Sequence, residues 1–172
     1  VDDLNIEFNI DTVRALIVTH CHIDHVGRIP YLLMAGFKGP IFTSVASASL
    51  LPLVIEDALK VGVTRDQKII DTCLRLLKQQ IIEVDFKTWF DLPCKGEHTA
   101  KARLQRAGHI LGSAYVEIDI GTPPHKANNN HRVVFSGDLG APYTPLLPAP
   151  KAPYKADTLV IESTYGDKNH QG

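Results

Sequence analysis

Hydrophobic and polar positions follow two different periods along the chain, and the change falls near residue 80. Before that point, a mostly apolar run at residues 13–19 predicts a buried strand, and a helix ending at a glycine is expected at about 26–35. A short strand at 41–43 is followed by apolar positions with helical spacing over 44–60. The first half of the chain is therefore predicted to alternate strand and helix.

A further helix is predicted to end near residue 80, and its start has a recognisable signal. The sequence Thr64-Arg65-Asp66-Gln67 has the form of a capping box. In that motif the threonine hydroxyl and the glutamine amide reciprocally satisfy backbone N–H groups that lack helical partners. We therefore expect the helix to begin at this segment.

Beyond residue 80 the hydrophobic period approaches two, which is typical of strands. The strand candidates are separated by turn signals and lie at 102–107, 114–120, 132–135 and 157–161. Residues 121–131 predict a long hairpin connection, and residues 141–156 hold five prolines and predict an irregular loop. The pattern as a whole predicts an α/β fold.

Composition limits the classes of protein that this chain can belong to. A chain of 172 residues with 44% hydrophobic residues can form one globular core, and a formal net charge of −1 provides no overall basic surface for nucleic acid. Three cysteines without paired spacing favour a reducing compartment. No apolar stretch approaches the roughly 20 residues of a membrane span, and no segment resembles a secretion signal. A cytoplasmic protein without a membrane partner is expected.

Residues 20–25 read His-Cys-His-Ile-Asp-His, directly after the first predicted strand. Side chains two positions apart on an extended strand point the same way, so His20 and His22 should converge while Cys21 faces away. Asp24 and His25 lie where the chain turns, and they can aim at a second point nearby. This spacing predicts a site for two neighbouring divalent ions; the alternative is a polar loop with several histidines.

Two further polar residues follow predicted strands. His109 comes after the strand that ends near Ala107, and Asp138 follows an apolar strand within Ser-Gly-Asp-Leu-Gly. Taken alone, the histidine has a structural interpretation and the aspartate can be a turn former. Together with residues 20–25, they supply the additional ligands that a two-metal site needs.

The order of these motifs resembles that of the metallo-β-lactamase superfamily. Residues 108–114 and 161–167 are similar to its β-CASP branch, which includes the endonuclease subunit of the cleavage and polyadenylation machinery and its bacterial and archaeal relatives. The resemblance implies an αβ/βα sandwich, two zinc ions and hydrolysis of phosphodiesters in RNA or, less often, DNA. Residues 1–172 would then form a partial metallo-β-lactamase domain that lacks the N-terminal strands and ends near the start of the β-CASP insertion.

The resemblance also implies a division of the metal ligands. One zinc would be bound by three imidazoles, the other by an aspartate and a histidine, and a second aspartate would bridge both: His20, His22 and His109; Asp24 and His25; Asp138. Two ions about 3.5–4 Å apart can lower the pKa of a shared water toward neutrality, so that it can attack phosphorus. The sequence does not distinguish zinc from manganese.

Asp24 and Glu162 are the residues expected to serve catalysis. Glu162 occupies the position of the first β-CASP motif, whose acidic residue is expected to orient a histidine that protonates the leaving oxygen. The alternative is a strand-end carboxylate that caps a turn. Tyr165 and His170 follow closely and are interpreted as structural or solvated.

Three functional hypotheses follow. The first is a two-zinc β-CASP nuclease that acts on RNA, the second is a hydrolase of a thioester, lactone or lactam, and the third is a non-catalytic scaffold paralogue. The family's final metal-binding histidine and its acid catalyst are expected beyond residue 172, so residues 1–172 alone should be inactive. A sandwich without its outer strands exposes hydrogen-bonding edges, and association into a homo-oligomer is therefore expected.

Overall fold

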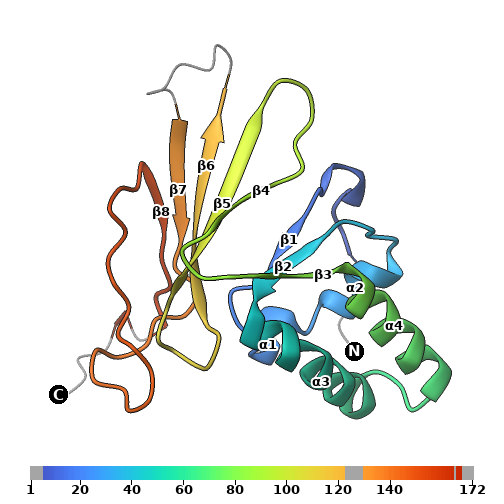
Figure 1. The fold of residues 1–172 in the computed structure, drawn as a ribbon. Coiled ribbons are helices and arrows are strands. Elements are labelled where there is room, and N and C mark those ends of the chain that lie inside the picture. Colours follow the sequence, from blue (N-terminus) through green and yellow to red (C-terminus); the bar gives the residue numbers. More distant parts are fainter. Residues whose placement is uncertain (1–5, 123–129, 165, 168–172) are drawn as a thin grey trace.

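The computed structural model describes residues 6–122, 130–164 and 166–167, which form two β-sheets and a layer of helices (Figure 1). The first sheet is parallel, in the order β1-β2-β3, with strands Leu16–Ile17, Ile41–Ser44 and Ile81–Val84. The second has the order β4-β5-β6-β7-β8, with strands Trp89–Asp91, Thr99–Arg106, Ala114–Gly121, Asn130–Phe135 and Thr158–Val160. Its strands are antiparallel except for β8, which runs parallel to β7.

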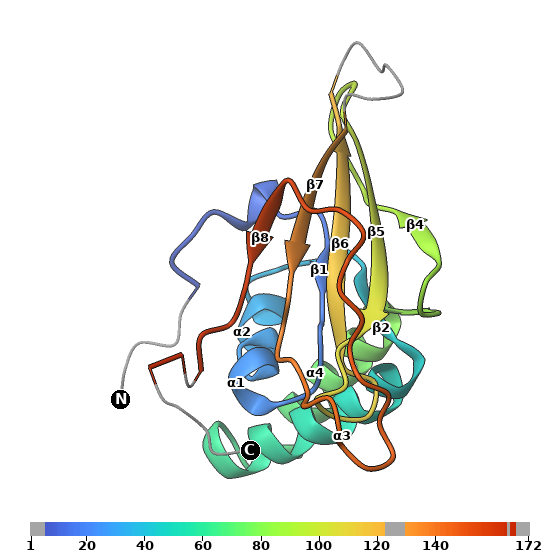
Figure 2. The ribbon, with the colours of Figure 1, turned by 90° about the vertical axis from the view of Figure 1, so that its left-hand side faces the viewer.

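Helices pack on one side of the first sheet, as both ribbon views show (Figure 2). They are α1 Ile23–Val26, α2 Ile29–Met34, α3 Val45–Gly62 and α4 Gln67–Gln80, preceded by the 3-10 helix Ile10–Thr12. The first of the long helices starts at Ser44, whose hydroxyl accepts a hydrogen bond from the backbone N–H of Ser47. This cap satisfies one of the orphan donors of the helix and fixes where α3 begins.

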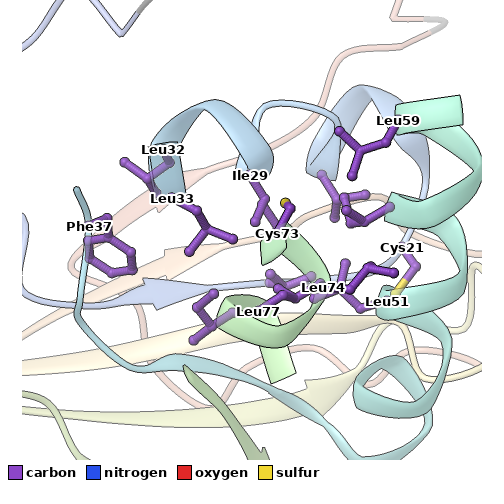
Figure 3. Packing of buried hydrophobic residues seen from close by; sticks show 14 of the residues in the cluster. Cys21, Ile29, Leu32, Leu33, Phe37, Leu51, Leu59, Cys73, Leu74 and Leu77 are labelled. Carbon is purple, nitrogen blue, oxygen red and sulfur yellow. The ribbon is translucent and has the colours of Figure 1, made fainter. Parts of the chain in front are cut away.

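Two hydrophobic clusters hold the layers together. The larger lies between the helices and the first sheet and includes Leu51, Leu59 and Leu77, all fully buried (Figure 3). The smaller lies between the two sheets, where Phe42 of β2 packs with Leu104 of β5 and their neighbours. The order of layers is therefore helices, first sheet, second sheet, which confirms the predicted α/β sandwich.

Several local predictions were wrong. The first strand covers only Leu16–Ile17 rather than 13–19, and the helix expected at 26–35 begins earlier and is divided into α1 and α2. Strands β3 and β4 were not predicted at all. Each is short, and each is defined by pairing with another strand, β3 with the distant β2 and β4 with the following β5, which local periodicity does not reveal.

The predicted capping box does not form. Asp66 is the N-cap of α4, and its carboxylate accepts from the backbone N–H of Lys68 at 2.9 Å. The Thr64 hydroxyl accepts instead from the N–H of Asp66, and the Gln67 amide donates to Asp71 one turn further on. A carboxylate two positions closer to the helix therefore replaces the threonine in capping it.

Some expectations lie outside the described residues, namely those for Tyr165 and His170 and for most of the connection at 121–131. No helix among the described residues is long and apolar enough to cross a membrane. The edge strand β8 is exposed, with Leu159 and Val160 half accessible to solvent. The expected self-association through an open sheet edge stays a prediction.

Candidate metal centre

Three segments that are distant in sequence meet where the strands end. They are the turn after β1, the connection between β5 and β6, and the turn after β7, and the last two lie at the lower end of the second sheet in Figure 1. Backbone hydrogen bonds tie them together: Ala114 N–H donates to the Thr19 carbonyl, and Gly140 N–H donates to the Ala107 carbonyl, each at 2.8 Å. The polar residues predicted for the site are therefore carried by segments bonded to one another.

Four of these residues converge on one point. The Nδ1 atom of His22 lies 3.2 Å from Nε2 of His20 and 3.0 Å from Nε2 of His109. The Oδ2 atom of Asp138 lies 3.7 Å from Nε2 of His20 and 3.6 Å from Nε2 of His109. These four donor atoms all lie within 4.8 Å of one another. The structure thus brings together residues 20, 22, 109 and 138, as the sequence predicts.

The remaining two predicted residues form a second group, in which His25 contacts the other oxygen of Asp138 and Asp24 contacts His25. Nε2 of His25 lies 3.2 Å from Oδ1 of Asp138 and 3.5 Å from Oδ2 of Asp24. The Asp24 side chain keeps 73% of its surface exposed, whereas that of Asp138 keeps 20%. The two oxygens of Asp138 therefore face different histidines, Oδ2 facing His20 and His109 and Oδ1 facing His25.

His20 is fully buried, and its environment holds it in the neutral form. Burial, together with the nearby His25, lowers its pKa from the usual 6.5 to about 4. The Thr19 hydroxyl lies 3.1 Å from Nδ1 of this imidazole, so Nε2 is the nitrogen that faces the cluster. A neutral imidazole with its other nitrogen engaged by a neighbour is the form in which histidine binds metals.

The loop that carries His109 is held by hydroxyl groups. The Ser113 hydroxyl accepts from the backbone N–H groups of His109 and Ile110, at 3.0 and 3.2 Å. The hydroxyls of Ser44 and Ser47, at the start of α3, donate to the Gly112 carbonyl at 2.6 and 3.2 Å. The position of His109 is therefore set by a helix from the first half of the chain.

Cys21 and Glu162 both lie next to the cluster without facing its donors. Cys21 is buried, and its thiol donates to the Ser47 carbonyl, so it points away from the cluster as expected. Oε1 of Glu162 accepts a hydrogen bond from the backbone N–H of Leu139 at 2.6 Å. Glu162 thus contacts the turn that carries Asp138.

Thr19, Ser44, Ser47 and Ser113 are the supporting residues that the sequence interpretation missed. The sequence does contain a signal for Ser44, because it is a serine at the junction of a strand and a helical pattern. Its second role, contact with a loop 68 residues away, has no local signal.

The donor set fits a divalent metal. Imidazole nitrogen and carboxylate oxygen are ordinary zinc ligands, and two donors about 2.0–2.1 Å from a tetrahedral ion lie roughly 3.3 Å apart. The four separations given above for the first group, 3.0–3.7 Å, are close to that value, and all of its donor atoms lie within 4.8 Å of one another. The fold and this cluster define the class of protein: an α/β sandwich with a candidate metal centre at its strand ends.

Comparisons with known proteins agree with this class. The family model "Metallo-beta-lactamase superfamily" matches residues 3–71. The chain is 32% identical over 169 residues to Ribonuclease TTHA0252 of Thermus thermophilus, covering 95% of this chain and 35% of that protein. It is 34% identical over 167 residues to Transcription termination factor FttA of Methanocaldococcus jannaschii, covering 93% of this chain and 24% of that protein.

The fold, the donor cluster and these matches together show that the chain is similar to members of the metallo-β-lactamase superfamily. Its motifs resemble those of the β-CASP branch. The chain spans about a third of the length of the ribonuclease and about a quarter of that of the termination factor.

Proposed function

We propose that the protein is a two-zinc metallohydrolase that cleaves phosphodiester bonds in RNA, and that residues 1–172 belong to its metallo-β-lactamase domain. The observation that carries the proposal is the arrangement around Asp138, whose Oδ2 faces His20 and His109 while its Oδ1 faces His25, which in turn contacts Asp24. RNA is favoured as substrate because relatives of this chain are named as a ribonuclease and as transcription termination factors.

Each of the six residues has a role in this proposal. One ion is assigned to His20, His22 and His109, the other to Asp24 and His25, and both to Asp138. Divalent ions bound there would act as Lewis acids on the phosphodiester and on the attacking water. Nitrogen-rich ligands favour zinc over magnesium or calcium, and manganese stays possible through metal availability.

The side chains of the cluster would determine the charge at each ion and how a substrate reaches the site. With three neutral imidazoles at the first ion, Asp138 would be the carboxylate that offsets its charge, whereas Asp24 would add a second carboxylate at the other ion. The cluster is open to solvent on the side of His22 and Asp24, which are both exposed. A long anionic polymer can reach an exposed site of this kind without entering a closed pocket. Glu162 is assigned to the same site as an acidic residue outside the ligand set.

Cleavage of labelled single-stranded RNA by the full-length protein tests the proposal. The variant D24A/H25A removes the second group of donors, and H98A removes a histidine from an exposed turn outside the cluster. We expect the double variant to lose at least 100-fold in rate, in line with the loss of a key catalytic group, while H98A keeps wild-type activity.

Metal content is measured on the same samples. About two zinc ions per chain in the wild-type protein and one or fewer in D24A/H25A would agree with the assignment. Equal RNA cleavage by both proteins would refute it. Hydrolysis of a thioester, lactone or lactam without RNA cleavage would identify a different hydrolase, and less than one bound ion per wild-type chain would indicate a non-catalytic paralogue.

A further inference from the structure

We propose that Glu162 is a positioning residue that holds the turn carrying Asp138 and thereby sets the affinity of the metal centre. This inference rests on the proposed metal site. Glu162 makes two hydrogen bonds to the turn after β7. Its carboxylate Oε1 accepts from the N–H of Leu139 at 2.6 Å, and its own N–H donates to the hydroxyl of Ser136 at 2.9 Å. Asp138 lies between these two contacted residues.

Strand β8 holds Glu162 in place. Phe135 pairs with Val160 in the parallel β7–β8 ladder, and the N–H of Ser136 continues it by donating to the Val160 carbonyl at 2.9 Å. Ser136 is buried, and its hydroxyl also donates to the Gly137 carbonyl at 2.6 Å. The register of two strands therefore places the Glu162 carboxylate directly beside the turn.

The turn has to be held because Asp138 has a short side chain. Its carboxylate must reach His25 with one oxygen, at 3.2 Å, and His20 and His109 with the other, at 3.7 and 3.6 Å. Only two side-chain torsions separate the carboxylate from the backbone, so a displaced backbone moves both oxygens at once. A contact that fixes the adjacent peptide therefore acts on both groups of donors.

The opposite end of β8 offers a matched comparison. Oδ2 of Asp157 accepts from the backbone N–H of Arg132 in β7 at 2.8 Å, which is the same kind of bond as that between Glu162 and Leu139. Asp157 precedes β8, whereas Glu162 follows it. Loss of either carboxylate removes one carboxylate-to-backbone hydrogen bond between the two strands, but only the loss of Glu162 affects the turn that carries Asp138.

The proposed role differs from that of orienting a catalytic histidine. Glutamine keeps an oxygen that can accept from Leu139 but removes the negative charge, and alanine removes both. If Glu162 positions Asp138, E162Q should keep the metal affinity and E162A should lose it. If Glu162 acts only by orienting a histidine, neither substitution should change metal affinity.

The test measures zinc affinity by competition with a chromophoric chelator, in the full-length protein and its E162Q, E162A and D157A variants, with circular dichroism to verify folding. We expect E162A to bind zinc 10–100-fold more weakly, as is typical when a partner outside the ligand set is lost, and E162Q and D157A to stay within about threefold of wild type.

The inference is overturned if E162A binds zinc like the wild type, if E162Q is weakened as much as E162A, or if D157A is weakened equally. In each of these results the wild-type protein still binds zinc. A wild-type protein that binds none would instead refute the proposed function, so the two failures can be told apart.

Discussion

Gly112 is the residue through which α3 controls the loop of His109, and its replacement by alanine should be costly. Gly112 has a φ of +82°, a region that side chains with a Cβ rarely adopt. An added Cβ would lie 2.8 Å from both the backbone nitrogen and the hydroxyl of Ser47 and 2.9 Å from the Ser44 hydroxyl. These are the two hydroxyls that donate to the Gly112 carbonyl. The substitution therefore adds strain and separates the loop from the helix.

The magnitude follows from these two effects. A left-handed backbone costs a residue with a Cβ about 1–2 kcal/mol, and each lost hydrogen bond costs about 0.5–1.5 kcal/mol. We expect G112A to lower the free energy of unfolding by about 2–5 kcal/mol when strain and bond loss combine. The displaced loop should also weaken zinc binding, because His109 lies three positions before Gly112.

Alanine substitutions at two other glycines separate the cost of backbone strain from the cost of losing the contact with α3. Gly36 has a φ of +100° with nothing within 4 Å of an added Cβ, so G36A measures the strain alone, about 1–2 kcal/mol. Gly62, the last residue of α3, has neither constraint, and G62A should be neutral or stabilise by up to about 1 kcal/mol. Equilibrium denaturation in guanidinium chloride compares the three variants. If G112A loses no more stability than G36A, the contact with α3 does not hold the loop.

The remaining predictions concern the buried ion pair of the second sheet and the reactivity of the thiols. Arg103 donates to the fully buried carboxylate of Glu117 at 2.7 Å, and Gln105 and Arg132 also face that carboxylate. Because these two partners remain, R103A should lower the free energy of unfolding by about 1–3 kcal/mol. No measurable loss in thermal or chemical unfolding would contradict this. Burial raises the pKa of the Cys21 and Cys73 thiols, whereas Cys94 is exposed. Ellman's reagent should therefore modify one thiol quickly in the folded protein and all of them after unfolding, and rapid reaction of every thiol under native conditions would show that the core is open.

Sequence reasoning located the site better than it located the strands. The spacing of His20 and His22 was sufficient to predict their convergence, because it depends only on the alternation of side chains along an extended segment. Strand β3 follows the last residue of α4 without an intervening turn residue, so no local signal separates it from the helix. Its strand character comes from pairing with β2, which is a tertiary effect.

The contacts within the candidate metal centre could not be predicted from the sequence either, because they also depend on tertiary packing. The sequence placed Asp138 after a strand, but the division of its two oxygens between two groups depends on the packing of one sheet against the other. Glu162 shows how far a local sequence signal reaches. Its position after a strand was evident, whereas its bond to Leu139 depends on the register between β7 and β8.

The distance in sequence between the donors has a consequence for how the protein matures. Residues 20–25 are contiguous and present several metal donors as soon as they are synthesised, whereas His109 joins His22 across 87 residues. Closing so long a loop costs chain entropy, which the folding of both sheets has to repay before all donors meet. A metal ion captured early would therefore be held by an incomplete set of ligands and could still exchange. The complete ligand set would form only when the second sheet docks, so the rate of metal release is expected to report the completion of folding.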